Sequence, residues 1–127
     1  MPEYSQSPLV KKLAIKPKTR IIAVNEIENF RDMLGELPEG TSYDDSLDGD
    51  FDWIIAFAKN EPELDGLIEN IKSHLKPTGT LWVAIPRANN SKFNRNTLTV
   101  SSARYGLDIT SNAVVNDDWT AYRYKKV

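Results

Sequence analysis

Two unbroken apolar runs, separated by a helical pattern, most constrain what this chain can fold into. Residues 53–58 read WIIAFA and residues 81–85 read LWVAI, without a polar residue in either run. Such runs are typical of parallel strands that helices cover on both faces, because neither face of the strand meets water. The sequence therefore predicts an α/β fold with a buried, mostly parallel sheet.

The segment between the two runs has the pattern of an amphipathic helix. Asn60 is expected to cap its start, Pro62 suits its first turn, and residues 76–79 (KPTG) are expected to stop it. A helix that joins two parallel strands makes a right-handed crossover. Its apolar residues recur at three- and four-residue spacing and form one stripe toward the sheet: Leu64, Leu67, Ile68, Ile71 and Leu75.

Other elements are predicted as layers around this unit. Thr99 is expected to cap a short helix that Gly106 ends, and Gly35 is expected to close a helix over 28–34. The resulting fold class is a three-layer, Rossmann-like α/β sheet with a C-terminal antiparallel hairpin. The remaining predicted elements are a helix over 8–15, strands over 20–25 and 107–115, an edge strand near 41–43, and a last strand over 119–125.

The length and composition of the chain limit how many domains it can form and which kinds of functional site it can contain. The 127 residues suit one domain over 1–127, with residues 1–7 expected to form a flexible arm. The chain has no cysteine and one histidine, His74, which excludes disulfides, iron–sulfur clusters, zinc sites and cysteine nucleophiles. No apolar run approaches the roughly 20 residues of a membrane span. We therefore expect a cytoplasmic protein without a membrane partner.

The charges are separated along the chain although the net charge is only −2. Fourteen of the eighteen acidic residues lie between Glu26 and Glu69, and the flanking segments are basic. This separation could guide an anionic ligand or favour head-to-tail self-association, but a solvated surface without a partner is the favoured explanation. The acidic stretch over 39–50 lacks the ligand spacing of a calcium loop, so no metal is expected there.

Several of these segments resemble class I S-adenosylmethionine-dependent methyltransferases. The C-terminal half of that superfamily runs FD, apolar strand, helix, LKPGG, apolar strand, and residues 51–57 (FDWIIAF) and 75–85 (LKPTGTLWVAI) keep this order. The stretches SPLVKKLAIKP (7–17) and LPEG (37–40) are similar to a small bacterial family of unknown function that has a shortened form of this fold. The resemblance covers most of the chain and implies a truncated methyltransferase-like topology.

The chain departs from that family where the cofactor binds. The methyltransferases follow their first strand with a glycine-rich turn, because the backbone approaches the cofactor closely. Here residues 25–30 (NEIENF) contain no glycine and two carboxylates, and only twenty-six residues separate Asn25 from Asp52, where the family has two further strands. The resemblance implies S-adenosylmethionine as a cofactor, whereas these departures predict that no cofactor is held and that usual methyl transfer is lost.

A ligand site is predicted at the carboxyl ends of the first strand and of the strand over 51–58, where the strand order should reverse. Lys59 and Arg87 supply cations, and a helix that begins at Asn60 favours anions at its N-terminus. A small anionic or nucleotide-like ligand is expected, unless Asn60 is only a cap and the cations are only solvated. The candidate crevice consists of Asn25, Glu26, Lys59, Asn60, Arg87, Asn89 and Asn90, beside Pro86.

Two functions fit the sequence. A non-catalytic binding or interaction module is favoured because no catalytic arrangement can be argued; His74 suits a helix C-terminus. The alternative is a small-molecule or nucleotide-binding enzyme related to the methyltransferases. A protein partner also fits, since a homodimer would bury Trp119, Tyr122 and Tyr124, and a monomer should leave some of them in water. A basic loop with Phe93 as a stacking ring is a weak sign of nucleic acid, and the acidic balance speaks against it.

Overall fold

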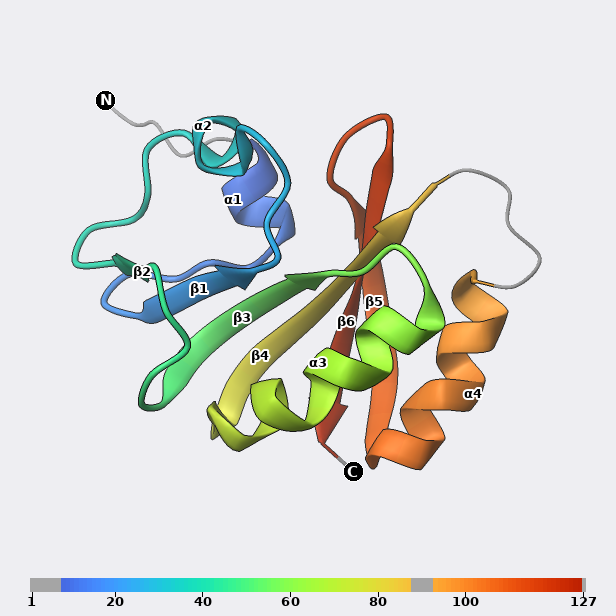
Figure 1. The fold of residues 1–127 in the computed structure, drawn as a ribbon. Helices are drawn as coiled ribbons and strands as arrows, with labels where there is room; N and C mark the ends of the chain where they lie inside the picture. The colour runs from blue at the N-terminus through green and yellow to red at the C-terminus, as the bar shows by residue number, and fades with distance from the viewer. Residues whose placement is uncertain (1–7, 88–92, 127) are drawn as a thin grey trace.

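A six-stranded sheet forms the centre of the computed structural model, which describes residues 8–87 and 93–126 (Figure 1). The expected arm, residues 1–7, lies outside that range. The strands are β1 (Arg20–Val24), β2 (Ser42–Asp44), β3 (Phe51–Phe57), β4 (Leu75–Pro86), β5 (Leu107–Val114) and β6 (Trp119–Lys126). The helices are α1 (Pro8–Lys12), α2 (Phe30–Leu34), α3 (Glu61–Ser73) and α4 (Arg95–Tyr105).

The strand order is β2-β1-β3-β4-β6-β5. Strands β1 to β4 pair in parallel, and β6 inserts between β4 and β5 with antiparallel pairing on both sides. From β1 the chain crosses outward to β2, and from β3 it crosses the other way to β4, so the order reverses between β1 and β3. The predicted Rossmann-like sheet, its reversal point and its C-terminal hairpin are confirmed.

The helices cover both faces of the sheet, which gives the predicted three layers. Helices α1 and α2 lie on one face, and α3 and α4 lie on the other (Figure 1). Strand β3 contributes to both cores because its side chains alternate: Trp53 and Ile55 pack toward α1 and α2, and Ile54 packs toward α3 and α4. The apolar run over 53–58 is thus buried on two sides, as its sequence indicates.

Four predicted helix boundaries are wrong. Helix α1 ends at Lys12 and not at residue 15, and α2 begins at Phe30 and not at residue 28. Helix α3 ends at Ser73 with His74 as its C-cap, and residues 76–79, expected as its stop, belong to β4. A β-carbon at Gly79 would lie 3.0 Å from the Lys76 carbonyl oxygen and 3.2 Å from that of Asp52, so this glycine permits the close approach of β3 and β4.

Helix α4 begins earlier than predicted, because Asn94 and not Thr99 is its N-cap. The Asn94 side chain accepts hydrogen bonds from the backbone N–H groups of Asn96 and Thr97, and the Thr97 hydroxyl accepts one from the Asn94 N–H. This reciprocal capping box adds a turn to the helix. Gly106 ends the helix in a left-handed conformation, as predicted.

The expectation that a monomer leaves some aromatic residues of the last strand in water holds for Trp119 and not for the two tyrosines. Tyr122 and Tyr124 are 9% and 1% exposed, and Trp119 is half-buried. The reason is that β6 is an inner strand with neighbours on both sides, and its tyrosines face the core under α3 and α4. A dimer is therefore not needed to cover them.

Within residues 8–87 and 93–126, no helix has both the length and the apolar character that crossing a membrane requires.

Candidate functional site

Two adjoining hollows lie at the carboxyl ends of β1, β3 and β4. We call them the inner hollow, of about 310 Å³, and the outer hollow, of about 590 Å³. They share Lys59 and Trp119, so they adjoin each other at the predicted reversal point. Asn25, Glu26, Ile27, Glu28, Phe57 and Glu63 also line the inner hollow, and Pro86, Arg87, Asp117 and Asp118 also line the outer one.

The turn after β1 is tied directly to the end of β3. Asn25 has a left-handed backbone (φ 58°), and its side-chain amide donates to the Phe57 carbonyl oxygen at 2.9 Å and to Glu63 Oε1 at 3.2 Å. The Asn25 side chain therefore bridges the gap between the two strands. A glycine would leave this space free for a ligand, since it has no side chain.

The Glu63 carboxylate of this chain lies at the N-terminus of α3, where an external anion would otherwise bind. Glu63 Oε1 accepts from the Lys59 backbone N–H at 2.8 Å, and the Glu63 N–H donates to Asn60 Oδ1 at 2.9 Å. The positive end of the helix dipole is thus complemented internally, as in a capping box. Asn60 is confirmed as the helix cap and lines neither hollow.

Three aromatic rings fill the space between the end of β3 and helix α2. Phe30 packs edge-to-face on Phe57, with ring centroids 5.0 Å apart, and Phe57 packs in the same way on Trp119 at 5.3 Å. Phe30 is 1% exposed and Phe57 is equally buried. Edge-to-face pairs add stability beyond their buried area. The rings close the floor of the crevice on the α2 side of the sheet.

A second polar cluster covers the carboxyl ends of β1 and β2. The Tyr43 hydroxyl donates to Glu26 Oε2 at 3.2 Å, and the Arg31 guanidinium lies 4.0 Å from the centre of the Tyr43 ring. Arg31 also pairs with Asp45, which raises the pKa of the guanidinium. Burial and the neighbouring Glu26 carboxylate raise the pKa of the Tyr43 hydroxyl, so it stays protonated and remains a donor.

The outer hollow has a rigid wall formed by the β5–β6 turn. The Arg87 N–H donates to the Asp118 carbonyl oxygen at 2.8 Å, and Asn116 Oδ1 accepts from the N–H groups of Asp118 and Trp119 at 2.8 and 2.9 Å. In the part of the chain that the structure describes, neither the Lys59 ammonium nor the Arg87 guanidinium forms an ion pair with a carboxylate. Two cations on this wall are therefore available to a ligand.

The predicted crevice residues separate into three groups. Asn25, Glu26 and Lys59 line the inner hollow, Lys59 and Arg87 line the outer one, and Asn60 is structural. Asn89 and Asn90 lie outside the described residues. That these side chains bind a ligand remains a prediction.

Sequence reasoning missed Glu63, Asp117, Asp118 and Trp119 as lining residues. The Asp-Asp-Trp turn was visible, but its position beside Arg87 depends on β6 pairing with β4, which strand patterns do not reveal. Phe93, considered as a stacking ring, is 2% exposed and packs in the core under α4. It offers no face to a nucleic-acid base.

Three solved structures with a similar fold are methyltransferases. A ribosomal protein L11 methylase from Lactobacillus delbrueckii subsp. bulgaricus matches with a TM-score of 0.62 and 13% identity, over 93% of this chain and 74% of that chain. A TehB-like methyltransferase from Corynebacterium glutamicum ATCC 13032 Kitasato matches at 0.54 and 12%, over 87% and 82%. The glycopeptide N-methyltransferase MtfA complexed with sinefungin matches at 0.57 and 10%, over 87% and 88%.

The fold is that of S-adenosylmethionine-dependent methyltransferases. No protein-family model matches the chain, and no curated protein does. Identities of 10 to 13% establish a common fold and nothing about activity. The predicted methyltransferase-like, shortened Rossmann topology is confirmed on this basis.

The residues at the turn after β1 do not fit the cofactor that this fold implies. The Asn25 amide and the Glu63 carboxylate occupy the gap between β1 and β3, and Phe30 fills the space beside it. Glu26 and Glu28 add negative charge beside the same gap, which disfavours the carboxylate of an amino-acid cofactor. We therefore derive no reaction step through S-adenosylmethionine.

Proposed function

We propose that this protein is a non-catalytic binding module that holds a small anionic ligand in the outer hollow, between Lys59 and Arg87. One observation carries the proposal: Asn25, Glu63 and Phe30 narrow the crevice between β1 and β3 to the small inner hollow. The adjoining outer hollow is larger and is lined by two cationic side chains, Lys59 and Arg87. We therefore place the anion nearer to the end of β4 than to the end of β1.

The chemistry of the outer hollow supports an anion. Arg87 offers a planar fork of donors that suits carboxylate or phosphate, and its backbone is held by the β5–β6 turn. Lys59 adds a second positive charge, and Pro86 and Trp119 supply apolar wall. Asp117 and Asp118 line the same hollow and oppose an anion, so we expect modest affinity, with a Kd of roughly 0.1 to 1 mM.

The fold itself supports a second candidate, an enzyme related to the methyltransferases that has kept affinity for a nucleotide. This candidate requires adenosyl compounds to bind, which the non-catalytic proposal does not.

Titration of the ¹⁵N-labelled protein with hexanoate and inorganic phosphate tests the proposal. Trp119 provides the signal because this residue lines both hollows, whereas the indole N–H groups of Trp53 and Trp82 are buried donors to the Leu13 carbonyl oxygen. We expect a saturable shift of the Trp119 resonance that Arg87→Gln weakens about fivefold.

Arg95→Gln is the matched control, because Arg95 is also an exposed arginine but lies on α4, away from both hollows. It should leave the affinity unchanged. Equal affinities for the wild type, Arg87→Gln and Arg95→Gln would overturn the assignment of the anion to this hollow, and so would the absence of any saturable shift.

A further inference from the structure

The inner hollow has the opposite charge to the cations of the outer hollow. Three carboxylates line it, those of Glu26, Glu28 and Glu63, against the single ammonium of Lys59. A ligand that carried only negative charge would be repelled here. Glu63 caps α3 and Glu26 accepts a hydrogen bond from Tyr43, so the anion-binding proposal leaves Glu28 without a role.

The three carboxylates differ in how far the protein already satisfies them. Glu63 accepts from the Lys59 N–H and the Asn25 amide, and Glu26 accepts from the Tyr43 hydroxyl. Glu28 is exposed and, within residues 8–87 and 93–126, accepts no hydrogen bond. Glu28 is thus the carboxylate with the most capacity for an external donor, and its negative charge is reinforced by the other two.

The complement of this hollow is an organic cation and not a metal ion. Among the described residues no group of three or more histidine, cysteine, aspartate or glutamate side chains is arranged to hold a metal. Trp119, which is half-buried, forms aromatic wall beside the carboxylates, whereas the Phe57 ring is only 1% exposed. Aromatic rings attract ammonium groups, and carboxylates accept their hydrogen bonds, so the two features suit the same ligand group.

We propose that the ligand is dipolar, with its anionic group at Arg87 and Lys59 in the outer hollow and an ammonium group at Glu28 in the inner hollow. The two hollows meet at Lys59 and Trp119, so an apolar spacer that crosses the Trp119 ring separates the two charges. The ligand class is an ω-amino acid, or a short peptide that presents one terminal or side-chain ammonium and one carboxylate. This inference rests on the proposed function, since it assigns the second end of the same ligand.

Three probes of equal length separate the two charges: 6-aminohexanoate, hexanoate and hexylamine, each titrated while the Trp119 indole resonance is followed. We expect 6-aminohexanoate to bind about fivefold more tightly than hexanoate and than hexylamine. Glu28→Gln should weaken 6-aminohexanoate and hexylamine about fivefold and leave hexanoate unchanged or slightly tighter. Arg87→Gln should weaken 6-aminohexanoate and hexanoate and leave hexylamine unchanged.

Glu36→Gln is the matched control, because Glu36 is exposed and lines neither hollow. Glu28 makes no contact that folding requires, and melting curves of the variants check this. If hexanoate binds as tightly as 6-aminohexanoate and Glu28→Gln has no effect, the dipolar ligand is wrong and the anion site stands. If hexylamine alone binds, or if none of the three probes binds, the proposed function fails together with this inference.

Discussion

The two faces of the sheet are covered by helices of different kinds. On one face α3 and α4 have thirteen and eleven residues, and each begins with an asparagine whose side chain caps it. On the other face α1 and α2 have five residues each, and the residue before α2, Asn29, makes no capping hydrogen bond with its side chain. Helices this short are marginal in water, so α1 and α2 depend on contacts with the sheet.

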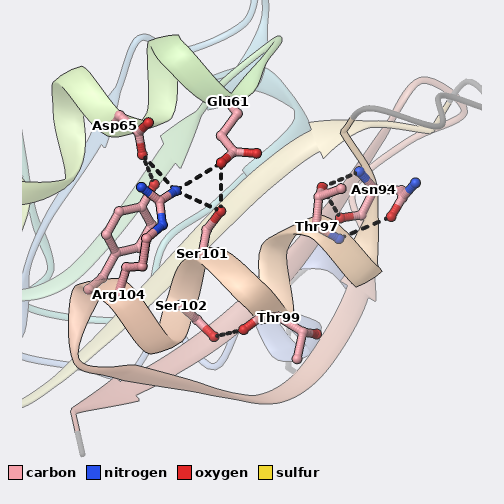
Figure 2. A network of polar contacts seen from close by, with 9 residues as sticks. Glu61, Asp65, Asn94, Thr97, Thr99, Ser101, Ser102 and Arg104 are labelled. Atoms are coloured by element: carbon pink, nitrogen blue, oxygen red, sulfur yellow. Dashed lines mark hydrogen bonds and ion pairs between the residues drawn. The ribbon is translucent and has the colours of Figure 1, made fainter.

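The contacts that the helices make also differ between the two faces of the sheet. Between α3 and α4 they are polar and partly exposed: Arg104 pairs with Glu61 and Asp65 and contacts Ser101, as Figure 2 shows. Such exposed pairs contribute little stability each. Both pairs of helices bury apolar side chains on the sheet, but the five-residue helix α2 buries only Phe30 and Leu34. The stability of α1 and α2 therefore depends on a few side chains.

This difference explains why only the small inner hollow is left between the ends of β1 and β3. A five-residue helix after β1 cannot move its N-terminus far from the sheet, so Phe30 at its start packs on Phe57 at the end of β3. The same short connection brings Asn25 within hydrogen-bonding distance of Glu63. The shortness of α2 and the narrowing of the crevice between β1 and β3 therefore have the same structural cause.

The largest expected effect comes from the two tryptophans that hold α1. The indole N–H groups of Trp53 and Trp82 both donate to the Leu13 carbonyl oxygen, at 2.8 and 2.9 Å. Each Trp→Phe variant should lower the free energy of unfolding by about 2 kcal/mol, and the double variant by about 5 kcal/mol, because only the double leaves this buried carbonyl without a donor. Urea unfolding measures this, and strictly additive losses would contradict the shared-acceptor account.

Phe30→Ala should cost about 4 kcal/mol, since Phe30 is fully buried and its ring contacts Phe57. Hydrogen exchange should show local loss of protection in α2, with α3 remaining protected. Leu64→Ala on α3 is the comparison: it removes an equally buried side chain from the other face and should weaken the protein globally. A loss below about 1 kcal/mol in Phe30→Ala would mean that α2 does not depend on this contact.

Substitutions at the N-caps of α4 and α2 should show a smaller difference in stability. Asn94→Ala should cost about 1 kcal/mol, because it removes the cap of α4. Asn29→Gly should change stability by only a few tenths of a kcal/mol, because Asn29 makes no cap and its left-handed backbone (φ 65°) suits glycine. Thermal melting of both variants distinguishes the two starts, and equal losses would contradict the difference between the faces.

The smallest effect is a pH dependence at the amino ends of the strands. Asp52 accepts from the Arg20 N–H at 2.8 Å and pairs with Lys76, and these contacts hold the pKa of its carboxyl below the usual value. A lowered folded pKa means that this stabilisation is present above the unfolded pKa of about 3.9 and is lost as pH falls below it. Asp52→Asn should flatten the acid limb of the stability curve, whereas an unchanged limb would show that Asp52 contributes nothing to it.

Sequence patterns were sufficient for the parts of the fold that depend on local periodicity. The apolar run over 53–58 identified β3, the stripe from Leu64 to Ile71 identified α3, and Asn60 was correctly placed as its cap. The start of α4 was missed because Asn94 lies in a polar segment where several residues could cap a helix. The end of α3 was misplaced because residues 76–79 read as a turn, although pairing with β3 makes them strand.

The candidate site depended on contacts that no local pattern contains. Lys59 and Arg87 could be placed near one edge of the sheet, because each follows a buried strand. The contact of Glu63 with the Lys59 N–H depends on side-chain direction. The presence of Asp117 beside Arg87 in the lining of the outer hollow depends on the insertion of β6. Those long-range features decide whether the crevice is open, and they required the structure.

Isothermal titration with S-adenosylhomocysteine tests the central claim most directly, because this compound requires the space that Asn25, Phe30 and Glu63 occupy. A methyltransferase of the same fold serves as the positive control. The narrowed crevice predicts no measurable heat of binding up to about 1 mM, equivalent to a binding free energy weaker than about 4 kcal/mol. A saturable isotherm with a micromolar Kd would show that the cofactor site is intact and would contradict the non-catalytic account.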